Sequence, residues 1–158
     1  MPEQTVTREK QFTITRVLDA PRETVWRTWT DPDEAPYWLH PRNVTTPRES
    51  VEYDLRAGGR YRYTMISTDG TEYPTVGTYR EVAPFDRLVF TWGSPDDADE
   101  SMPVVTVELA EHGASGEQTH MTFHLDGWAG APGDGFVYDG WDEALDLFEE
   151  RLASRRAR

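Results

Sequence analysis

The chain has 158 residues, with 16 Lys and Arg against 29 Asp and Glu, a formal net charge of -13, and no cysteine. This length predicts a single domain, and the missing cysteines exclude a disulfide scaffold, a thiolate zinc site and a cysteine nucleophile. An acidic surface repels nucleic-acid phosphates and anionic lipids, and no apolar run is long enough to span a membrane. We therefore expect a cytoplasmic protein with neither a nucleic-acid nor a membrane partner.

The first elements are a strand and a helix. Residues 1–10 show no apolar period and are expected to form a flexible lead-in. Residues 12–18 are β-branched and partly alternating, which is typical of a strand. Pro21 then opens a helix, since proline is best tolerated at the first helical position. The helix is expected to end at Asp31, because a residue before proline is pushed out of the α region.

A second, short helix is predicted to follow at once. Asp31 can cap it, and Glu34 stands where the carboxylate of a capping box reaches back to the N–H of the cap. Pro36 lies just inside this helix and keeps it short. Residues 37–40 are therefore expected at or beyond its end.

The middle of the chain reads as a run of strands separated by turn signals. Gly58 and Gly59 can take the positive φ angles of a tight hairpin, and Asp69-Gly70 marks the next turn. Short links between consecutive strands predict an antiparallel meander with one hidden face. The six strands expected after the first cover residues 51–55, 61–65, 76–82, 88–92, 105–109 and 121–125.

The hidden face follows from parity, because side chains alternate across a strand. Arg60 and Arg62 are expected to point outward, and the strand at 76–82 leaves its inner side undecided. The positions expected to point inward are Val51, Tyr53, Leu55, Tyr61, Tyr63, Met65, Val105, Val107, Leu109, Met121, Phe123 and Leu125.

The clearest helix comes last, after a glycine-rich stretch at residues 127–135. Trp141, Leu145, Phe148 and Leu152 are spaced at i, i+4, i+7 and i+11, which makes one apolar stripe. This stripe can close the apolar face of the sheet. Residues 154–158 are expected to form a basic tail.

Several motifs together resemble a known family. They are APRETVWRTWTDP at residues 20–32, DLRAGGRY at 54–61, GTYREV at 77–82, RLV at 87–89, and Gly140-Trp141 with Leu145 and Leu152. In this order they resemble the START-like (SRPBCC) superfamily and, within it, the homologues of the Hsp90 ATPase activator. The resemblance places one domain at residues 11–153.

The resemblance implies an α+β helix-grip fold, in which a curved, seven-stranded antiparallel sheet wraps around a long C-terminal helix, with two short helices after the first strand. It also implies an internal cavity for a small apolar or aromatic molecule. Some members of the superfamily are aromatases or cyclases, and the co-chaperone relatives act on a chaperone. A chaperone is therefore a second candidate partner.

Inward parity and the resemblance together define a set of candidate ligand-binding residues. Pockets favour aromatic walls with a few polar tips, which Tyr hydroxyls and Trp N–H groups supply. The alternative is that these rings only fill a core in which Leu and Ile are scarce. The set comprises Trp26, Trp38, Tyr53, Tyr63, Met65, Tyr79, Phe90, Trp92, Val107, Phe123, Trp141 and Leu145.

Two histidines and an acidic run are the candidate metal ligands of the sequence. His120 and His124 lie on a predicted strand, where four residues separate the rings by roughly 13 Å, too far to share an ion. The acids at residues 96–100 lack the spacing, the turn glycine and the closing glutamate of a calcium loop. No metal or cofactor is expected.

Catalytic and surface candidates are weaker still. Ser94 lacks the second glycine of a nucleophile elbow. Glu81 is the one carboxylate of its strand that can face the cavity as an acid or base, and a position in water at the strand's end is the alternative. Arg56, Arg60 and Arg62 form a candidate anion or partner patch, or a solvated face.

No catalytic residue is assigned, and the leading hypothesis is binding of a small hydrophobic or aromatic ligand. The alternatives are a cyclase-type enzyme using the same cavity and a chaperone-interacting module.

Overall fold

The structure is a computed structural model that describes residues 10–156, so the expected lead-in lies outside it except for Lys10. The elements follow in the order β1 (Gln11–Leu18), α2 (Arg22–Thr30), α3 (Ala35–Trp38), β2 (Val44–Thr45), η1 (Arg48–Ser50), β3 (Glu52–Tyr53), β4 (Arg60–Ser67), β5 (Glu72–Ala83), β6 (Arg87–Thr91), η2 (Asp99–Ser101), β7 (Val104–His112), β8 (Gln118–Asp126) and α4 (Val137–Arg156). Within residues 10–156, no helix combines the length and apolar character that crossing a membrane requires.

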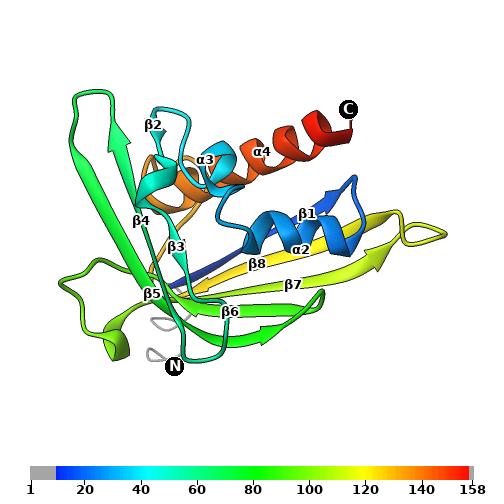
Figure 1. Cartoon of the computed structure of the whole chain (residues 1–158), viewed down its shortest axis with the longest axis horizontal. Helices are drawn as coiled ribbons and strands as arrows, with labels where there is room; N and C mark the ends of the chain where they lie inside the picture. The colour runs from blue at the N-terminus through cyan, green and yellow to red at the C-terminus, as the bar shows by residue number, and fades with distance from the viewer. Residues whose placement is uncertain (1–9, 157–158) are drawn as a thin grey trace.

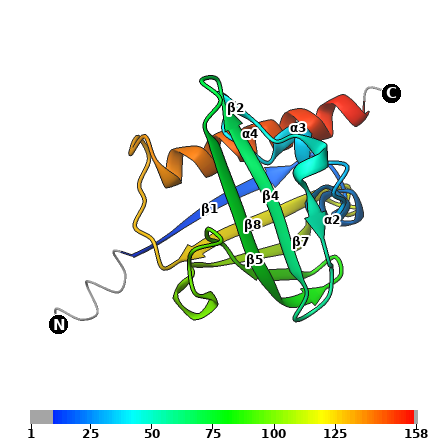
Figure 2. The same cartoon turned by 60° about the vertical axis from the view of Figure 1, so that its left-hand side comes forward.

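The strands form one antiparallel sheet in the order β1-β8-β7-β6-β5-β4-β2, with β3 also paired to β4. Figure 1 shows the sheet curving around α2, α3 and α4, and Figure 2 shows β4 and β5 turned across the other strands. The expected α+β helix-grip fold is confirmed. The described chain has eight strands rather than seven, because β2 is a two-residue strand too short to show any alternation.

The buried face of the sheet matches the parity argument where strands are long and regular. Val105, Val107 and Leu109 on β7 are at most 6% exposed, and the inner residues of β8 are completely buried. The stripe of α4 packs against them, with its four members at most 5% exposed. Leu55 is an exception: it is 38% exposed, because β3 has already ended at Tyr53.

The short helices begin later than predicted. Pro21 is the N-cap of α2 rather than its first helical residue. Residues 32–34 form a turn, α3 covers only Ala35–Trp38, and its first turn contains Pro36. Glu34 makes no capping bond to Asp31, so the predicted capping box is wrong. Its carboxylate instead pairs with an arginine of α4, and this distant contact could not be inferred from the local sequence.

Glu34 forms a nearly buried ion pair with Arg151 of α4. Its two oxygens accept bonds of 2.8 and 3.2 Å from the guanidinium, and the two side chains are 9% and 11% exposed. Arg155 approaches the same carboxylate at 3.7 Å, and Tyr37 lies with its ring 3.7 Å from the guanidinium carbon of Arg151. These contacts fix α3 to the last turns of α4.

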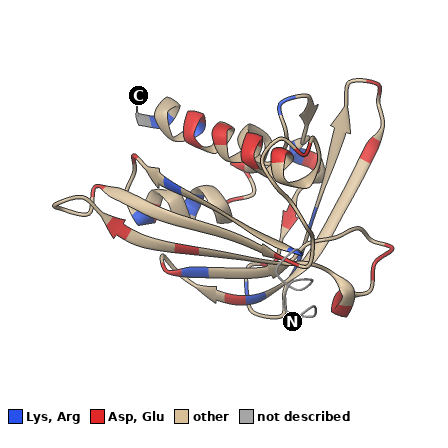
Figure 3. Cartoon of the chain, turned by 180° about the vertical axis from the view of Figure 1, so that it is seen from behind, with Lys and Arg blue, Asp and Glu red and all other residues tan. Residues whose placement is uncertain are grey.

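Arg16 attaches the outer face of α4 to the edge strand β1. Its guanidinium lies 2.5 to 2.9 Å from the carboxylates of Asp142, Asp146 and Glu149. Figure 3 shows the acids repeated along this helix. The helix continues to Arg156, so residues 154–156 of the expected basic tail are helical, and 157–158 lie outside the described residues.

The predicted tight hairpin at Gly58-Gly59 is a wider bend. Residues 54–59 connect β3 to β4, and of the two glycines only Gly58 has a positive φ, at 87°. Gly59 is buried, and its carbonyl oxygen accepts the backbone N–H of Tyr79 at 2.8 Å. A Cβ on Gly59 would lie 2.0 Å from the carbonyl oxygen of Asp54, so close approach rather than φ requires glycine here.

Gly59→Val is therefore expected to lower the free energy of unfolding by more than about 1 kcal/mol, because the Asp54 backbone must move to admit the side chain. Urea denaturation of both proteins measures the difference. Ala57→Val, at the exposed neighbouring position, is the matched control and should leave stability nearly unchanged. Equal midpoints for Gly59→Val and the wild type would contradict the close approach.

Candidate functional site

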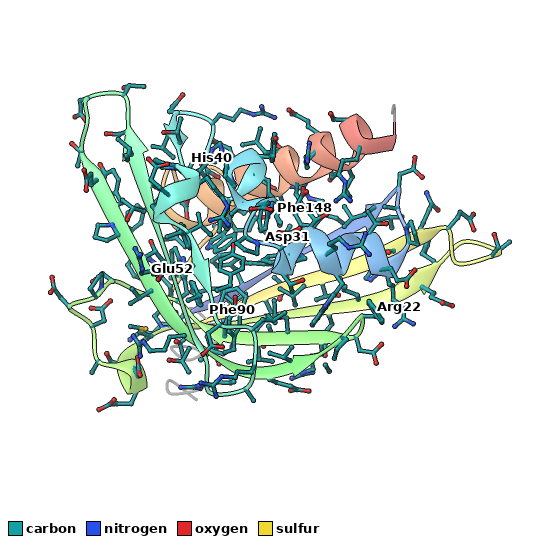
Figure 4. All side chains as sticks on the ribbon, viewed as in Figure 1. Arg22, Asp31, His40, Glu52, Phe90 and Phe148 are labelled. Atoms are coloured by element: carbon teal, nitrogen blue, oxygen red, sulfur yellow. The ribbon has the colours of Figure 1, made fainter. Side chains whose placement is uncertain are left out.

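Two adjoining hollows lie between the sheet and the helices. The larger has a volume of about 160 Å³ and the smaller about 30 Å³. Leu39, Tyr63 and Trp141 line both and separate them. Figure 4 shows aromatic side chains filling the surrounding interior, with Phe90 on the sheet side, Phe148 on the helix side and His40 beyond α3.

The larger cavity is lined by the segment after α3, by β4, by Trp92 directly after β6, and by Phe136 with the first turns of α4. Val137, Gly140, Trp141 and Ala144 are spaced so that one face of α4 meets the cavity. Gly140 contributes no side chain and leaves room. The complete lining is Leu39, His40, Pro41, Tyr63, Met65, Trp92, Phe136, Val137, Gly140, Trp141 and Ala144.

The smaller cavity is lined almost wholly by rings. Leu88 and Phe90 reach it from β6, where alternate residues point inward. Tyr61 also belongs to its wall, and its hydroxyl donates to the carbonyl of Thr91 at 2.7 Å. The full lining is Trp29, Trp38, Leu39, Tyr53, Tyr61, Tyr63, Tyr79, Leu88, Phe90 and Trp141.

Two of the polar side chains of the larger cavity already have hydrogen-bond partners. Trp92 Nε1 donates to the Tyr63 hydroxyl at 3.2 Å. The two ring nitrogens of His40 face the carbonyl oxygens of Pro41 and Pro36 at 2.8 and 3.0 Å. Neither cavity has a Lys, Arg, Asp or Glu side chain in its described lining.

Burial keeps the tyrosine hydroxyls protonated. It raises the pKa of Tyr63 to about 12, and it also raises the pKa of Tyr61 and of Tyr79 well above the ordinary value. These groups are therefore neutral near pH 7 and do not serve as general bases. The arrangement suits an uncharged guest better than acid–base chemistry.

Eight of the twelve predicted site residues line a cavity. They are Trp38, Tyr53, Tyr63, Met65, Tyr79, Phe90, Trp92 and Trp141. Val107, Phe123 and Leu145 are instead packed into the core and are at most 1% exposed. Trp26 lies apart from both linings, with its ring against Phe85 at a centroid distance of 6.3 Å.

Trp29, rather than Trp26, is the tryptophan of α2 that lines the smaller cavity. Its ring lies 4.7 Å from Trp38 and 5.7 Å from Phe148. Helical spacing placed both tryptophans on the apolar face of α2, but it could not show which end of that helix lies next to the cavity. Leu39, His40, Pro41 and Phe136 were also missed, since they lie in connections without periodicity.

The other candidates lie outside the cavities. Glu81 is half-exposed and pairs with Arg87, because the register shifts between Tyr79 and Glu81 and turns its side chain outward. His124 bonds to Thr13 at 2.7 Å. No group of three or more His, Asp or Glu side chains in residues 10–156 is placed to hold a metal ion.

The arginines of the candidate patch form ion pairs at the surface, and one acid of the loop at residues 96–100 accepts a backbone hydrogen bond. Arg56 pairs with Asp54, Arg60 with Asp99 and Arg62 with Glu52, at 2.8 to 3.1 Å. The backbone N–H of Ser94 donates to Asp97. Of the two alternatives for these arginines, a binding patch and a solvated face, the ion pairs favour the solvated face.

Comparison with known proteins supplies the family. The sequence model of the family described as Activator of Hsp90 ATPase homolog 1-like protein matches residues 19–153. The chain belongs to this family. No curated protein matches it.

Solved structures of other proteins share the fold of this family member. A protein from Nitrosomonas europaea is 23% identical, with a TM-score of 0.77 and coverage of 95% of this chain and 98% of that one. A protein from Chromobacterium violaceum is 26% identical, with a TM-score of 0.75 and coverage of 89% and 96%. An AHSA1-like protein from Aeromonas hydrophila is 22% identical, with a TM-score of 0.70 and coverage of 93% and 96%.

Two of the motifs that indicated this family occupy distinct places in the structure. Gly140 and Trp141 lie in the cavity wall, where the absent side chain of one and the ring of the other shape the hollow. The motif at residues 54–61 forms the bend that contacts Tyr79. In this Hsp90 ATPase activator-like chain, the first motif therefore borders both cavities, and the second forms the bend and adds Tyr61 to the wall of the smaller cavity.

Proposed function

We propose that this protein binds a small, uncharged, apolar or aromatic molecule in the larger cavity. The observation that carries the proposal is a hollow of about 160 Å³ walled mainly by aliphatic and aromatic side chains between the sheet and the helices. Engineered apolar cavities of about 150 Å³ stay dry and bind benzene. A ligand of about one ring with a short substituent fits this volume.

Phe136 marks the mouth of the cavity. Its side chain lines the hollow and is also 64% exposed, so it stands between the hollow and solvent. Trp128, which is 38% exposed, packs against it with ring centroids 5.6 Å apart. The exposed aromatic pair gives an apolar guest a route between water and the interior.

A cavity-filling substitution tests the proposal. A Cβ at Gly140 would make only an ordinary contact, 3.6 Å from Pro41, so Gly140→Leu should fold and occupy part of the hollow. Single-ring ligands such as ethylbenzene and acetophenone are expected to raise the melting temperature of the wild type. The same additions should leave Gly140→Leu unchanged, with binding weakened at least about tenfold because the space is taken.

The matched control for that test is Ala153→Leu, which adds the same side chain at an exposed position of α4. It should respond to ligand as the wild type does. Native mass spectrometry of wild-type protein from its own host supplies an independent readout. A wild type that neither shifts with any ring-sized ligand nor carries one would overturn the proposal.

The family name supports a chaperone as a second partner. The three arginines of the candidate patch already pair with carboxylates, which gives this surface less support than the cavity has. Loss of chaperone capture on charge reversal of Arg60 and Arg62 would favour the chaperone. A cyclase-type activity and a cytoplasmic location stay predictions.

A further inference from the structure

Trp141 has a buried N–H without an acceptor. Its side chain is 5% exposed, and within residues 10–156 Nε1 meets no hydrogen-bond partner. Three other buried or half-buried indoles are satisfied: Trp29 by the Met121 sulfur at 3.3 Å, Trp38 by the Thr28 carbonyl at 3.1 Å, and Trp92 by the Tyr63 hydroxyl at 3.2 Å. Buried donors without partners are rare, because losing water without compensation is unfavourable.

The surroundings of Trp141 explain why the protein itself leaves it unpaired. Its nearest rings belong to Phe123, Trp92 and Trp29, with centroids at 4.7, 5.6 and 6.5 Å. None of these side chains carries a strong acceptor. Trp141 also lines both hollows, so a molecule in either one would lie against its side chain.

We propose that the ligand of this cavity carries a hydrogen-bond acceptor, such as a carbonyl oxygen, which receives the N–H of Trp141. This inference rests on the proposed function and narrows it to an uncharged, single-ring ketone, aldehyde or ester rather than a hydrocarbon. A carboxylate is disfavoured because no Lys or Arg side chain belongs to the described lining of either cavity, and a buried charge without a partner is strongly unfavourable.

A bound water is the competing acceptor. The smaller cavity, at about 30 Å³, has room for a water, and four tyrosine side chains belong to its wall. The two acceptors predict different responses. If the acceptor is a ligand carbonyl, the NMR signal of the Trp141 indole N–H and the ligand affinity both depend on whether the ligand has that oxygen. If the acceptor is a resident water, neither the signal nor the affinity depends on the ligand oxygen.

The test compares acetophenone with ethylbenzene, which have nearly the same shape and differ in the carbonyl oxygen. Dissociation constants are measured by calorimetry for the wild type and for Trp141→Phe, which keeps a ring and removes the N–H. Trp141→Phe is expected to weaken acetophenone about fivefold, the order of one neutral hydrogen bond, and to change ethylbenzene less than twofold. Trp92→Phe is the matched control, because its N–H already has a partner in the same cavity, and it should affect both ligands alike.

A second readout avoids dependence on the folding of the variant. In the wild type labelled with ¹⁵N, the indole proton of Trp141 should move downfield with acetophenone and not with ethylbenzene. Equal affinity losses for the two ligands, or an indole signal that responds equally to both, would overturn the acceptor proposal while leaving ligand binding standing. Binding of neither ligand would overturn the acceptor proposal, and the proposed function would fall with it if no other ring-sized molecule binds.

Discussion

Raising the pH above about 10 is expected to unfold the domain cooperatively, because buried tyrosines ionise only in the unfolded chain. Tyr61, Tyr63 and Tyr79 are at most 5% exposed, and burial raises the pKa of each. Near pH 10 the unfolded chain loses these protons while the folded chain keeps them. The unfolded state then binds fewer protons, so stability falls as pH rises, with a limiting slope of roughly 4 kcal/mol per pH unit once all three groups are ionised in the unfolded chain.

Circular dichroism and tyrosinate absorbance, recorded together from pH 8 to 12.5, measure this effect. The signal of the three buried tyrosines should appear with the loss of secondary structure rather than before it. Tyr79→Phe removes one of the ionising groups and should make stability fall less steeply with pH, whereas Tyr73→Phe, at a half-exposed ring, should alter the slope little. Full tyrosinate absorbance in a protein that remains folded would show that the hydroxyls are open to water.

Glu34→Ala is expected to lower the free energy of unfolding by about 3 kcal/mol. The substitution leaves the guanidinium of Arg151, which is 11% exposed, without its bidentate partner, and it also removes the nearby charge that Arg155 approaches. Breaking one side of a buried pair is harmful because the remaining charge has lost both water and its counter-ion. The last turns of α4 should lose protection from hydrogen exchange first, since this pair joins them to α3.

The neighbouring residue provides the control for that substitution. Asp33 pairs with Arg48 at 2.7 Å, but the two side chains are 74% and 49% exposed. Solvent screens such pairs, so Asp33→Ala should change stability by less than about 1 kcal/mol. Urea denaturation of both variants decides the matter, and a similar small loss for each would mean that the Glu34 pair is solvated in solution.

Local periodicity predicted the long strands and the last helix of this fold. It failed at residues whose role depends on contacts with distant parts of the chain. Alternation in β7 and β8 and the stripe of α4 identified the core correctly, because a long strand or helix turns each side chain by a fixed angle. Glu34 looked like a capping residue, and only the packing of α3 against α4 shows its partner. Gly59 was expected to take a positive φ in a tight hairpin, whereas glycine is required there because a carbonyl oxygen lies 2.0 Å from where a Cβ would be, which depends on how the chain returns.

The cavity was predicted less completely than the fold, for a related reason. Strand parity located Tyr63 and Phe90, whose orientation is a local property. It could not predict which inward residues fill space and which leave it open, because a void depends on the volumes of all neighbours together. Phe123 and Gly140 illustrate the two cases, since the ring is fully buried in the core whereas the glycine lines the hollow.

The pairing of β1 with β8 has a consequence for how the chain folds. Gln11 lies opposite Asp126 and Leu18 opposite Thr119, so partners more than one hundred residues apart must meet before the sheet is complete. Pairing across such separations lowers folding rates, since the entropy of closing the loop is lost before the contacts form. During synthesis β1 is expected to remain without its partner strand until β8 has left the ribosome. The helix α4, which covers both strands, leaves the ribosome later still.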